Sequence, residues 1–407
     1  MQTNPSKTVD ELLAALSFIV DIEGNKKLYH AWRVAILATK FAHRLKANQQ
    51  KHIFYACLMH DFGAVGLTRH ITHFLKNESK IGTALPLLLS HPLIGAQLIS
   101  TLPNINAVSR LIMGHHEWFN GLGYPMGKSA GLIPRGAQLI RAADSIDITL
   151  RWTPYAKLNT VARKIRAITN KEISSSVAKL AINELKKNNF LNSVADLERI
   201  RPVFQQIKNK IEPLHMTKGI DAIGRTLEVI AQIIDMKHPF TSGHSVRVSR
   251  YAMAISLALK LKHDDITRIK WAGLIHDIGK LSIPRSILSK PAKLTKKEFS
   301  RVRKHPEMTE KILGMVPSLQ EITAIASGHH EYYDGTGYPR GLEANESMLG
   351  ARILTICDAF DAMTSNRPYR YPLSPKDACK EIKKLSGKQF DPQIAKVALP
   401  LFKNLGL

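Results

Sequence analysis

The sequence predicts an all-α protein of two tandem domains joined by a helical linker. Strand patterns are weak almost everywhere, whereas apolar residues recur at helical spacing between the prolines. The run HHEYYDGTGYP at His329–Pro339 has a near copy, HHEWFNGLGYP, at His115–Pro125. A repeat at this distance indicates duplication of a whole domain, because solenoid repeats have periods of about 20–50 residues. The length of 407 residues also suits two domains.

Helices are expected in the same order in both halves. Thr241 or Ser242 can cap the first helix of the second half, and the next helix follows Asp264 and Asp265 and ends near Gly279. The helices expected in the first half are Tyr29–Leu45, Gln49–Met59, Pro92–Thr101, Ala107–His116 and Ile133–Leu150. Those expected in the second half are Ser242–Leu261, Ile266–Ile278, Lys296–Leu313, Leu319–His330 and Ser347–Ser365.

The first domain is expected to end near Pro202. Phe190-Leu191-Asn192 and the helix after it resemble Phe390-Asp391-Pro392 and the helix that closes the chain. A connecting helix follows and is interrupted near Pro213. The expected divisions are therefore a first domain over residues 1–202, a helical linker over 203–235 and a second domain over 236–407.

Composition limits the class of protein. No apolar run reaches the roughly 18 residues that a membrane span needs, and Met1–Asp10 lacks the apolar region of a signal peptide. Three cysteines without paired spacing fit a reducing compartment, so we expect a cytoplasmic protein. The net charge of +25 comes from dispersed Lys and Arg without interleaved aromatic residues. This pattern favours a basic surface that attracts anions over a nucleic-acid interface.

Histidines and acidic residues repeat in the same two-fold frame. Most pairs, such as His30 and His244, lie 214 residues apart, whereas His60 and His276 lie 216 apart. The series in the second half is His244, His276, Asp277, His305, His329, His330 and Asp358. The series in the first half is His30, His60, Asp61, His91, His115, His116 and Asp144.

These donor types indicate a metal centre. Imidazole and carboxylate together suit Mn, Fe, Zn, Co or Ni better than Ca or Mg alone. Seven donors are too many for one tetrahedral ion and are about right for two ions that share a bridging carboxylate. Two ions roughly 3.5–4 Å apart are suited to phosphoryl chemistry, because they stabilise both the attacking and the leaving oxygen.

The second half resembles the HD-GYP proteins, a branch of the HD phosphohydrolase superfamily. The resemblance rests on His276-Asp277-Ile278-Gly279-Lys280 and on His329–Pro339, and it extends from about Met236 to the C-terminus. The first half looks like a divergent copy. The tandem arrangement is similar to that of bacterial phosphodiesterases of 3',3'-cyclic GMP-AMP and cyclic di-GMP. The family implies two tandem HD-type helical domains and metal-dependent hydrolysis of cyclic dinucleotides.

The resemblance also implies roles for single residues. One metal would be held by His244, His276, Asp277 and Asp358, and Asp277 would bridge to a second metal held by His305, His329 and His330. The implied cofactors are two divalent transition metals, Fe or Mn ahead of Ni, Co or Zn. Some family members bind a third metal through a Glu where this chain has Phe240, so we expect two. Asp277 and Lys280 are the expected catalytic residues. The expected substrate contacts are Lys280, Arg367, Arg370, Asp361, Gly335, Tyr338 and Pro339.

The expected reaction is hydrolysis of a 3',3'-cyclic dinucleotide to a linear dinucleotide by attack of a metal-bridging hydroxide. The alternative is a catalytically silent scaffold that binds cyclic dinucleotides or partner proteins. A nucleotidase, as in other HD proteins, is disfavoured by the complete Gly-Tyr-Pro signature. The Gly-Tyr-Pro loop is expected to shape the rim of the site and orient His329 and His330, and the resemblance offers the alternative of a docking loop for dinucleotide cyclases. The other expected partners are the cyclic dinucleotide and a second copy in a homodimer.

The first half keeps the donors but lacks the phosphate-binding cations. Lys280 corresponds to Ala64, and Arg367 and Arg370 correspond to Thr153 and Ala156. Charge-assisted hydrogen bonds contribute on the order of 1.5–3 kcal/mol each, so this loss weakens phosphodiester binding. We therefore expect a metal-capable, catalytically weak domain with a regulatory or stabilising role. The alternative is a second enzyme with another substrate.

Overall fold

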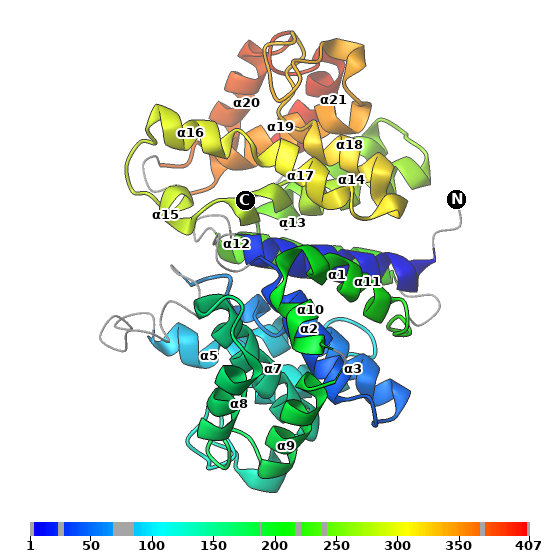
Figure 1. Cartoon of the computed structure of the whole chain (residues 1–407). Helices are drawn as coiled ribbons and strands as arrows, with labels where there is room; N and C mark the ends of the chain where they lie inside the picture. The colour runs from blue at the N-terminus through cyan, green and yellow to red at the C-terminus, as the bar shows by residue number, and fades with distance from the viewer. Residues whose placement is uncertain are drawn as a thin grey trace. The chain divides into compact units, whose positions relative to one another are not determined.

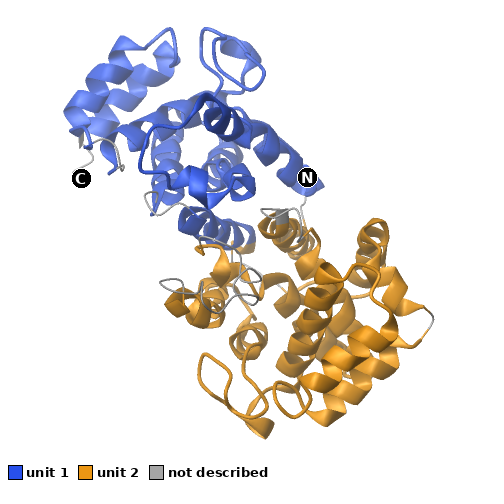
Figure 2. Ribbon diagram, turned by 60° about the vertical axis from the view of Figure 1, so that its left-hand side comes forward, with its two compact units in different colours: residues 1–3, 223–407 blue, residues 4–222 orange. Residues whose placement is uncertain are grey.

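The computed structural model describes residues 4–22, 28–67, 85–187, 189–215, 221–237, 242–366 and 371–404. Helices make up the regular structure of these ranges, and only isolated β-bridges accompany them, which confirms the all-α class (Figure 1). The chain divides into two compact units, called here the N-terminal unit (residues 4–222) and the C-terminal unit (residues 223–407) (Figure 2). The division falls within the segment 203–235 assigned to the linker. No helix in the described ranges is both long and apolar enough to span a membrane.

The N-terminal unit begins with a helix that the sequence analysis did not anticipate, α1 (Pro5–Ile22), whose Leu12, Leu13 and Leu16 are buried. Short 3-10 turns lie at Phe62–Ala64 and Ala130–Leu132. The remaining helices are α2 (His30–Phe41), α3 (Ala47–Met59), α5 (Leu85–Ile99), α6 (Asn106–Gly114), α7 (Arg135–Trp152), α8 (Leu158–Ala167), α9 (Ser175–Leu185), α10 (Phe190–Ala195) and α11 (Leu197–Lys208).

The C-terminal unit begins with α12 (Ala222–Lys237). Its 3-10 turns lie at Ile278–Ser282, Pro317–Leu319 and Ala344–Glu346. The other helices are α13 (His244–Ala258), α14 (His263–Ile275), α15 (Arg285–Leu288), α16 (Lys296–Val302), α17 (His305–Leu313), α18 (Gln320–Ser327), α19 (Leu349–Thr364), α20 (Pro375–Lys384) and α21 (Pro392–Asn404).

Both units pack their helices in the same way. In the N-terminal unit α2 packs on α3 and α7, and α6 packs on α3 and α5. In the C-terminal unit α13 packs on α14 and α19, and α18 packs on α14 and α17. The repeat in the sequence is therefore a repeat of the helical scaffold. Helices α2, α3, α5, α6 and α7 correspond to α13, α14, α17, α18 and α19.

Most expected helices are found with limits shifted by a few residues, and two larger differences involve a proline. The expected helix Lys296–Leu313 is two helices, because the chain turns at Arg303 and Lys304 and α17 restarts with Pro306 in its first turn. The helix expected to begin at Pro92 begins at Leu85 instead and contains Pro92. Proline lacks an N–H and therefore leaves the carbonyl four residues earlier without its helical donor. In the N-terminal unit the helix continues through Pro92, whereas in the C-terminal unit a new helix begins at His305, directly before Pro306.

Candidate metal centres

Five helices of the C-terminal unit bring the predicted donors together. His244 and His305 are the first residues of α13 and α17, His276 follows α14, and His330 lies just beyond α18. The ligand atoms form two separate groups able to hold a metal ion, each with its atoms within 4.8 Å of one another. One group is His244, His276 and Asp358, and the other is His305, His329 and His330; a third group, His276, Asp277 and His329, overlaps both.

Asp277 lies between the two groups. Its Oδ2 atom is 3.6 Å from Nε2 of His244 and 3.4 Å from Nε2 of His276. Its Oδ1 atom is 3.3 Å from Nε2 of His305 and 3.9 Å from Nε2 of His329. One carboxylate oxygen therefore faces each group, which is the geometry that a bridging carboxylate requires.

The protein backbone orients the imidazoles. Nδ1 of His276, His305 and His329 lies 2.9, 2.7 and 2.6 Å from the carbonyl oxygens of Gly273, Val302 and Ala326, each three residues earlier. A ring that donates its Nδ1 proton to a carbonyl presents an unprotonated Nε2 to the centre.

The carbonyls that orient His305 and His91 have no helical donor. Val302 is the last residue of α16, so its carbonyl has no helical donor and accepts from Nδ1 of His305, the residue before Pro306, at 2.7 Å. Leu88 is four residues before Pro92, so its carbonyl lacks the helical donor and accepts from Nδ1 of His91 at 2.6 Å. The carbonyl that orients the histidine is therefore left open by Pro92 within a helix in the N-terminal unit and by the end of α16 in the C-terminal unit.

Burial keeps the histidines of the second group neutral. It lowers the pKa of His305 to about 3, with Lys280 adding to the effect, and it lowers the pKa of His330 to about 4. Burial opposes ionisation of Asp277, but Lys280 and the neighbouring histidines hold the pKa of that carboxyl well below its usual range. Neutral imidazole and ionised carboxylate are the forms that bind metals.

Two buried atoms at the centre fit a cation. Nε2 of His276 and Oδ1 of Asp277 are inaccessible to solvent and make no hydrogen bond within the described ranges. A buried polar atom normally has a partner, because desolvation without one costs about 1–3 kcal/mol. Both atoms point into the donor cluster, so a bound ion would satisfy them. The cluster is therefore compatible with divalent metal binding.

Asp361 lies behind the centre. Its Oδ2 atom is 2.7 Å from Nδ1 of His244, and its Oδ1 atom accepts from Nε of Arg247 at 2.6 Å. The residue is only 1% exposed. This position supports a role in orienting His244, because a carboxylate on the distal nitrogen fixes the ring of a ligand histidine. It does not support the direct substrate contact expected from the sequence.

The residues expected to bind phosphate have different surroundings. Nζ of Lys280 lies 2.5 Å from Oδ2 of Asp277, at the edge of the centre. Arg367 and Arg370 lie outside the described residues, as does Phe240. The ring of Tyr338 packs against that of His330, with 4.7 Å between centroids, and Arg303 lies 4.5 Å from the Tyr338 centroid.

A small basic pocket adjoins this loop. It has a volume of about 360 Å³, and Tyr338 and Pro339 form one wall. The other lining residues are Lys296, Phe299, Ser300, Arg303, Lys304 and Glu307. Because Tyr338 contacts both this pocket and His330, an anion in the pocket would lie beside the metal centre.

Glu331 holds the Gly-Tyr-Pro loop, a role that the sequence analysis missed. Its buried carboxylate accepts backbone N–H groups of Arg340, Gly341 and Leu342 at 2.8, 2.9 and 3.0 Å. Gly335 has φ +75°, and a Cβ there would lie 2.5 Å from the Glu343 side chain, so the turn requires glycine. The sequence carries a signal for this role, because a glutamate directly follows both His-His pairs.

The N-terminal unit repeats the centre incompletely. His30, His60 and Asp61 form one group, and a second group consists of His91, His115 and His116. Asp144 belongs to neither group. Its Oδ1 atom is 4.0 Å from Nε2 of His30, compared with 3.3 Å for Asp358 and His244.

Arg141 explains the position of Asp144. Its NH1 donates to Oδ2 of Asp144 at 2.8 Å, and its guanidinium also binds Glu172. The corresponding residue of the C-terminal unit is Thr355, which carries no charge. The positive charge of the buried Arg141 guanidinium opposes binding of a metal cation by the neighbouring donors. The number of donor residues in the sequence does not reveal this guanidinium.

Comparisons with known proteins agree with the geometry. The family model described as HD domain matches residues 17–173 and 228–394, one match in each unit. The 3'3'-cGAMP-specific phosphodiesterase 3 of Vibrio cholerae is 31% identical over 278 residues, which cover 68% of this chain. The cyclic di-GMP phosphodiesterase of Thermotoga maritima is 36% identical over 191 residues, which cover 46% of this chain. The aligned segments span 59% and 52% of the lengths of these two relatives.

Two further matches extend over most of the chain. The 3'3'-cGAMP-specific phosphodiesterase 1 of Vibrio cholerae is 28% identical over 87% of this chain and 82% of its own length. The crystal structure of a cyclic GMP-AMP specific phosphodiesterase of the same organism matches with a TM-score of 0.65 at 23% identity, over 98% of both chains. The structural match confirms the fold, and the sequence matches confirm the resemblance noted from the motifs.

Proposed function

The chain belongs to the HD domain family, and from this premise we propose that its C-terminal unit is a phosphodiesterase that hydrolyses 3',3'-cyclic dinucleotides. The observation that carries the proposal is the Asp277 carboxylate, which presents one oxygen to each of two histidine groups. The relatives that match this unit are named as phosphodiesterases of 3'3'-cGAMP or cyclic di-GMP.

We assign the cofactor as two divalent transition metals, Fe or Mn ahead of Ni, Co or Zn. His244, His276 and Asp358 would hold one ion, and His305, His329 and His330 would hold the other, with Asp277 shared. When bound, such ions supply Lewis acidity toward the phosphate and a water nucleophile at neutral pH.

The side chains of the C-terminal unit have distinct tasks in this reaction. Lys280 neutralises Asp277 in the free protein and is close enough to the centre to meet a phosphate oxygen there. Arg367 and Arg370 would each bind phosphate oxygens through bidentate hydrogen bonds. Asp361 holds the His244 ring in one orientation. The buried Glu331 fixes the loop that carries Tyr338 against His330.

Product analysis tests the proposal. We expect Mn- or Fe-loaded protein to convert cyclic di-GMP, 3',3'-cyclic GMP-AMP or both to linear dinucleotides, which chromatography separates from the substrates. The ratio of the two rates would identify the preferred substrate. Linear nucleotides serve as the control for a nucleotidase. Absence of cleavage of either compound, with metals verified in place, would contradict the proposal and favour the catalytically silent scaffold.

Metal content tests the difference between the units. We expect about two ions per chain, because Arg141 draws Asp144 away from the N-terminal donors. Elemental analysis of the purified protein would measure the ratio, and Arg141→Thr, which installs the residue of the C-terminal unit, should raise it. About four ions per chain before any substitution would show that the N-terminal centre also fills.

The proposal extends to protein partners. Dinucleotide cyclases would dock on the Gly-Tyr-Pro loop, where Asp334 and Thr336 are exposed and are held in a turn by the Asp334 carboxylate. Two copies of the chain would associate as a homodimer.

A further inference from the structure

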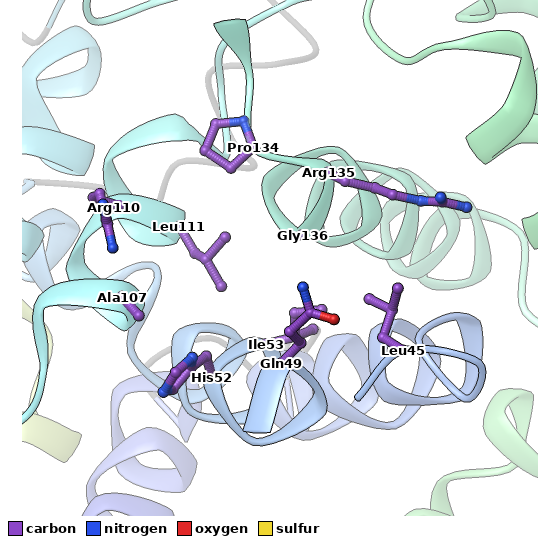
Figure 3. A pocket seen from close by; sticks show the side chains of 10 residues that line it. All are labelled: Leu45, Gln49, His52, Ile53, Ala107, Arg110, Leu111, Pro134, Arg135 and Gly136. Carbon is purple, nitrogen blue, oxygen red and sulfur yellow. The ribbon is translucent and has the colours of Figure 1, made fainter. Parts of the chain in front are cut away.

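A second pocket lies in the N-terminal unit, away from its histidine groups. It has a volume of about 360 Å³ and is lined by residues of α3, α6 and α7 and by Leu45. Its α3 residues include Ile53, seven positions before His60, which corresponds to about 10 Å along a helix. The lining residues are Leu45, Gln49, His52, Ile53, Ala107, Arg110, Leu111, Pro134, Arg135 and Gly136 (Figure 3).

The internal repeat shows what is special about this pocket. Its apolar wall recurs in the C-terminal unit, where Leu261, Ile269 and Ile325 stand at the positions of Leu45, Ile53 and Leu111. Five other lining residues are replaced by residues of different charge or polarity. Gln49, His52, Ala107, Arg110 and Arg135 correspond to Asp265, Arg268, Glu321, Ala324 and Leu349.

The residues that differ between the two units give this position a different electrostatic character in each unit. In the C-terminal unit Arg268 forms ion pairs with Glu321 at 2.6 Å and with Asp265 at 3.0 Å, so its charge is satisfied within the protein. In the N-terminal unit the pocket is lined by two arginines and no acidic residue. Within the described ranges, neither Arg110 nor Arg135 forms an ion pair. The same scaffold position is therefore a self-neutralised contact in the C-terminal unit and a cationic pocket in the N-terminal unit.

We propose that this pocket binds a nucleotide. Figure 3 shows Arg110 and Arg135 on opposite sides of the pocket, with Leu111 and Gln49 between them. An arginine suits a phosphate because its planar fork makes paired hydrogen bonds, and it also stacks on flat rings. The apolar wall provides a surface for a base. The oxygen of the Gln49 amide accepts from the Lys46 N–H at 3.3 Å, and its NH2 group can donate a hydrogen bond to a base edge.

Size and backbone polarity agree with this class of ligand. A volume of about 360 Å³ lies at the small end of the range of ligand pockets, about 300–1,000 Å³, and suits a mononucleotide better than a macromolecule. Ala107 and Arg135 belong to the first turns of α6 and α7, whose N-termini carry partial positive charge. These dipoles add to the arginines, so the ligand is expected to be anionic.

Calorimetric titration of the full-length protein tests the proposal. The probes are guanosine 5'-monophosphate, adenosine 5'-monophosphate and inorganic phosphate, with chelator present to remove metal from the histidine groups. We expect saturable binding of at least one nucleotide, tighter than that of phosphate. Arg110→Ala and Arg135→Ala should each weaken it roughly tenfold or more, the effect of one charge-assisted hydrogen bond. Both arginines are exposed, so neither change should disturb the fold.

Two further variants make the test specific. His52→Arg with Ala107→Glu rebuilds the Arg268–Glu321 pair inside the pocket and should abolish binding, with circular dichroism to verify folding. Arg166→Ala removes an equal, exposed charge from α8 of the same unit and should leave the affinity unchanged. No nucleotide binding at millimolar ligand, equal affinity for phosphate alone, or binding that survives both arginine changes would overturn the proposal.

Discussion

Replacement of Asp277 by asparagine is expected to lower kcat for cyclic dinucleotides by roughly a thousandfold or more, the scale found for residues that act as one catalytic unit. The carboxylate presents one oxygen to each histidine group, at 3.4 Å from His276 and 3.3 Å from His305. An amide of the same size has one acceptor oxygen and no charge, so it cannot serve both groups. Initial rates of product formation would measure the effect, together with the metal content of the variant.

The internal repeat provides the matched control. Asp61→Asn makes the same change at the equivalent position of the N-terminal unit, where Asp61 is 3.4 Å from His30 and 3.6 Å from His91. We expect this variant to keep most of its turnover, because that unit lacks the residues corresponding to Lys280, Arg367 and Arg370. Equal losses in both variants would mean that both centres are required. Full turnover in Asp277→Asn with metal bound would refute the assignment.

The clustering of the candidate donors was predictable, because most of them recur in the two halves of the chain 214 residues apart, and His60 and His276 lie 216 apart. Several of the donor histidines lie at helix ends. The last carbonyl groups of a helix, such as those of Gly273 and Ala326, lack helical donors and can therefore orient an imidazole. The partners of the donors were harder to predict. Arg141 binds Glu172, 31 residues away, and no local pattern announces that contact.

Helix limits failed for a local reason. Pro92 was expected to start a helix, but α5 continues through it, whereas the helix expected to run through Pro306 is divided just before that proline. The side chain of His91 donates to the carbonyl that Pro92 leaves open, and this compensates for part of the cost. Sequence periodicity does not report such a compensation, because it depends on where a side chain of the same turn points.

The largest loss of stability is expected from Asp147→Asn in the N-terminal unit. Asp147 is fully buried, and it pairs with Arg33 at 2.6 Å, His30 at 2.7 Å and Arg151 at 2.7 Å. Burial raises the pKa of this carboxyl, but Arg151, His30 and Arg33 together lower it below its ordinary value. Loss of the charge leaves two buried arginines uncompensated, which costs on the order of 3–5 kcal/mol in the free energy of unfolding.

Asp361→Asn is the matched change in the C-terminal unit, and it is expected to cost less. Asp361 is equally buried, but its partner Arg247 has a side chain that is 31% exposed, compared with 3% for Arg33. Arg247 can turn toward water when its partner loses charge, whereas Arg33 and Arg151 cannot. Urea unfolding of both metal-free variants, followed by circular dichroism, would compare the two. Equal losses would show that burial of the cations does not control the cost, and that the shared contact with the histidine does.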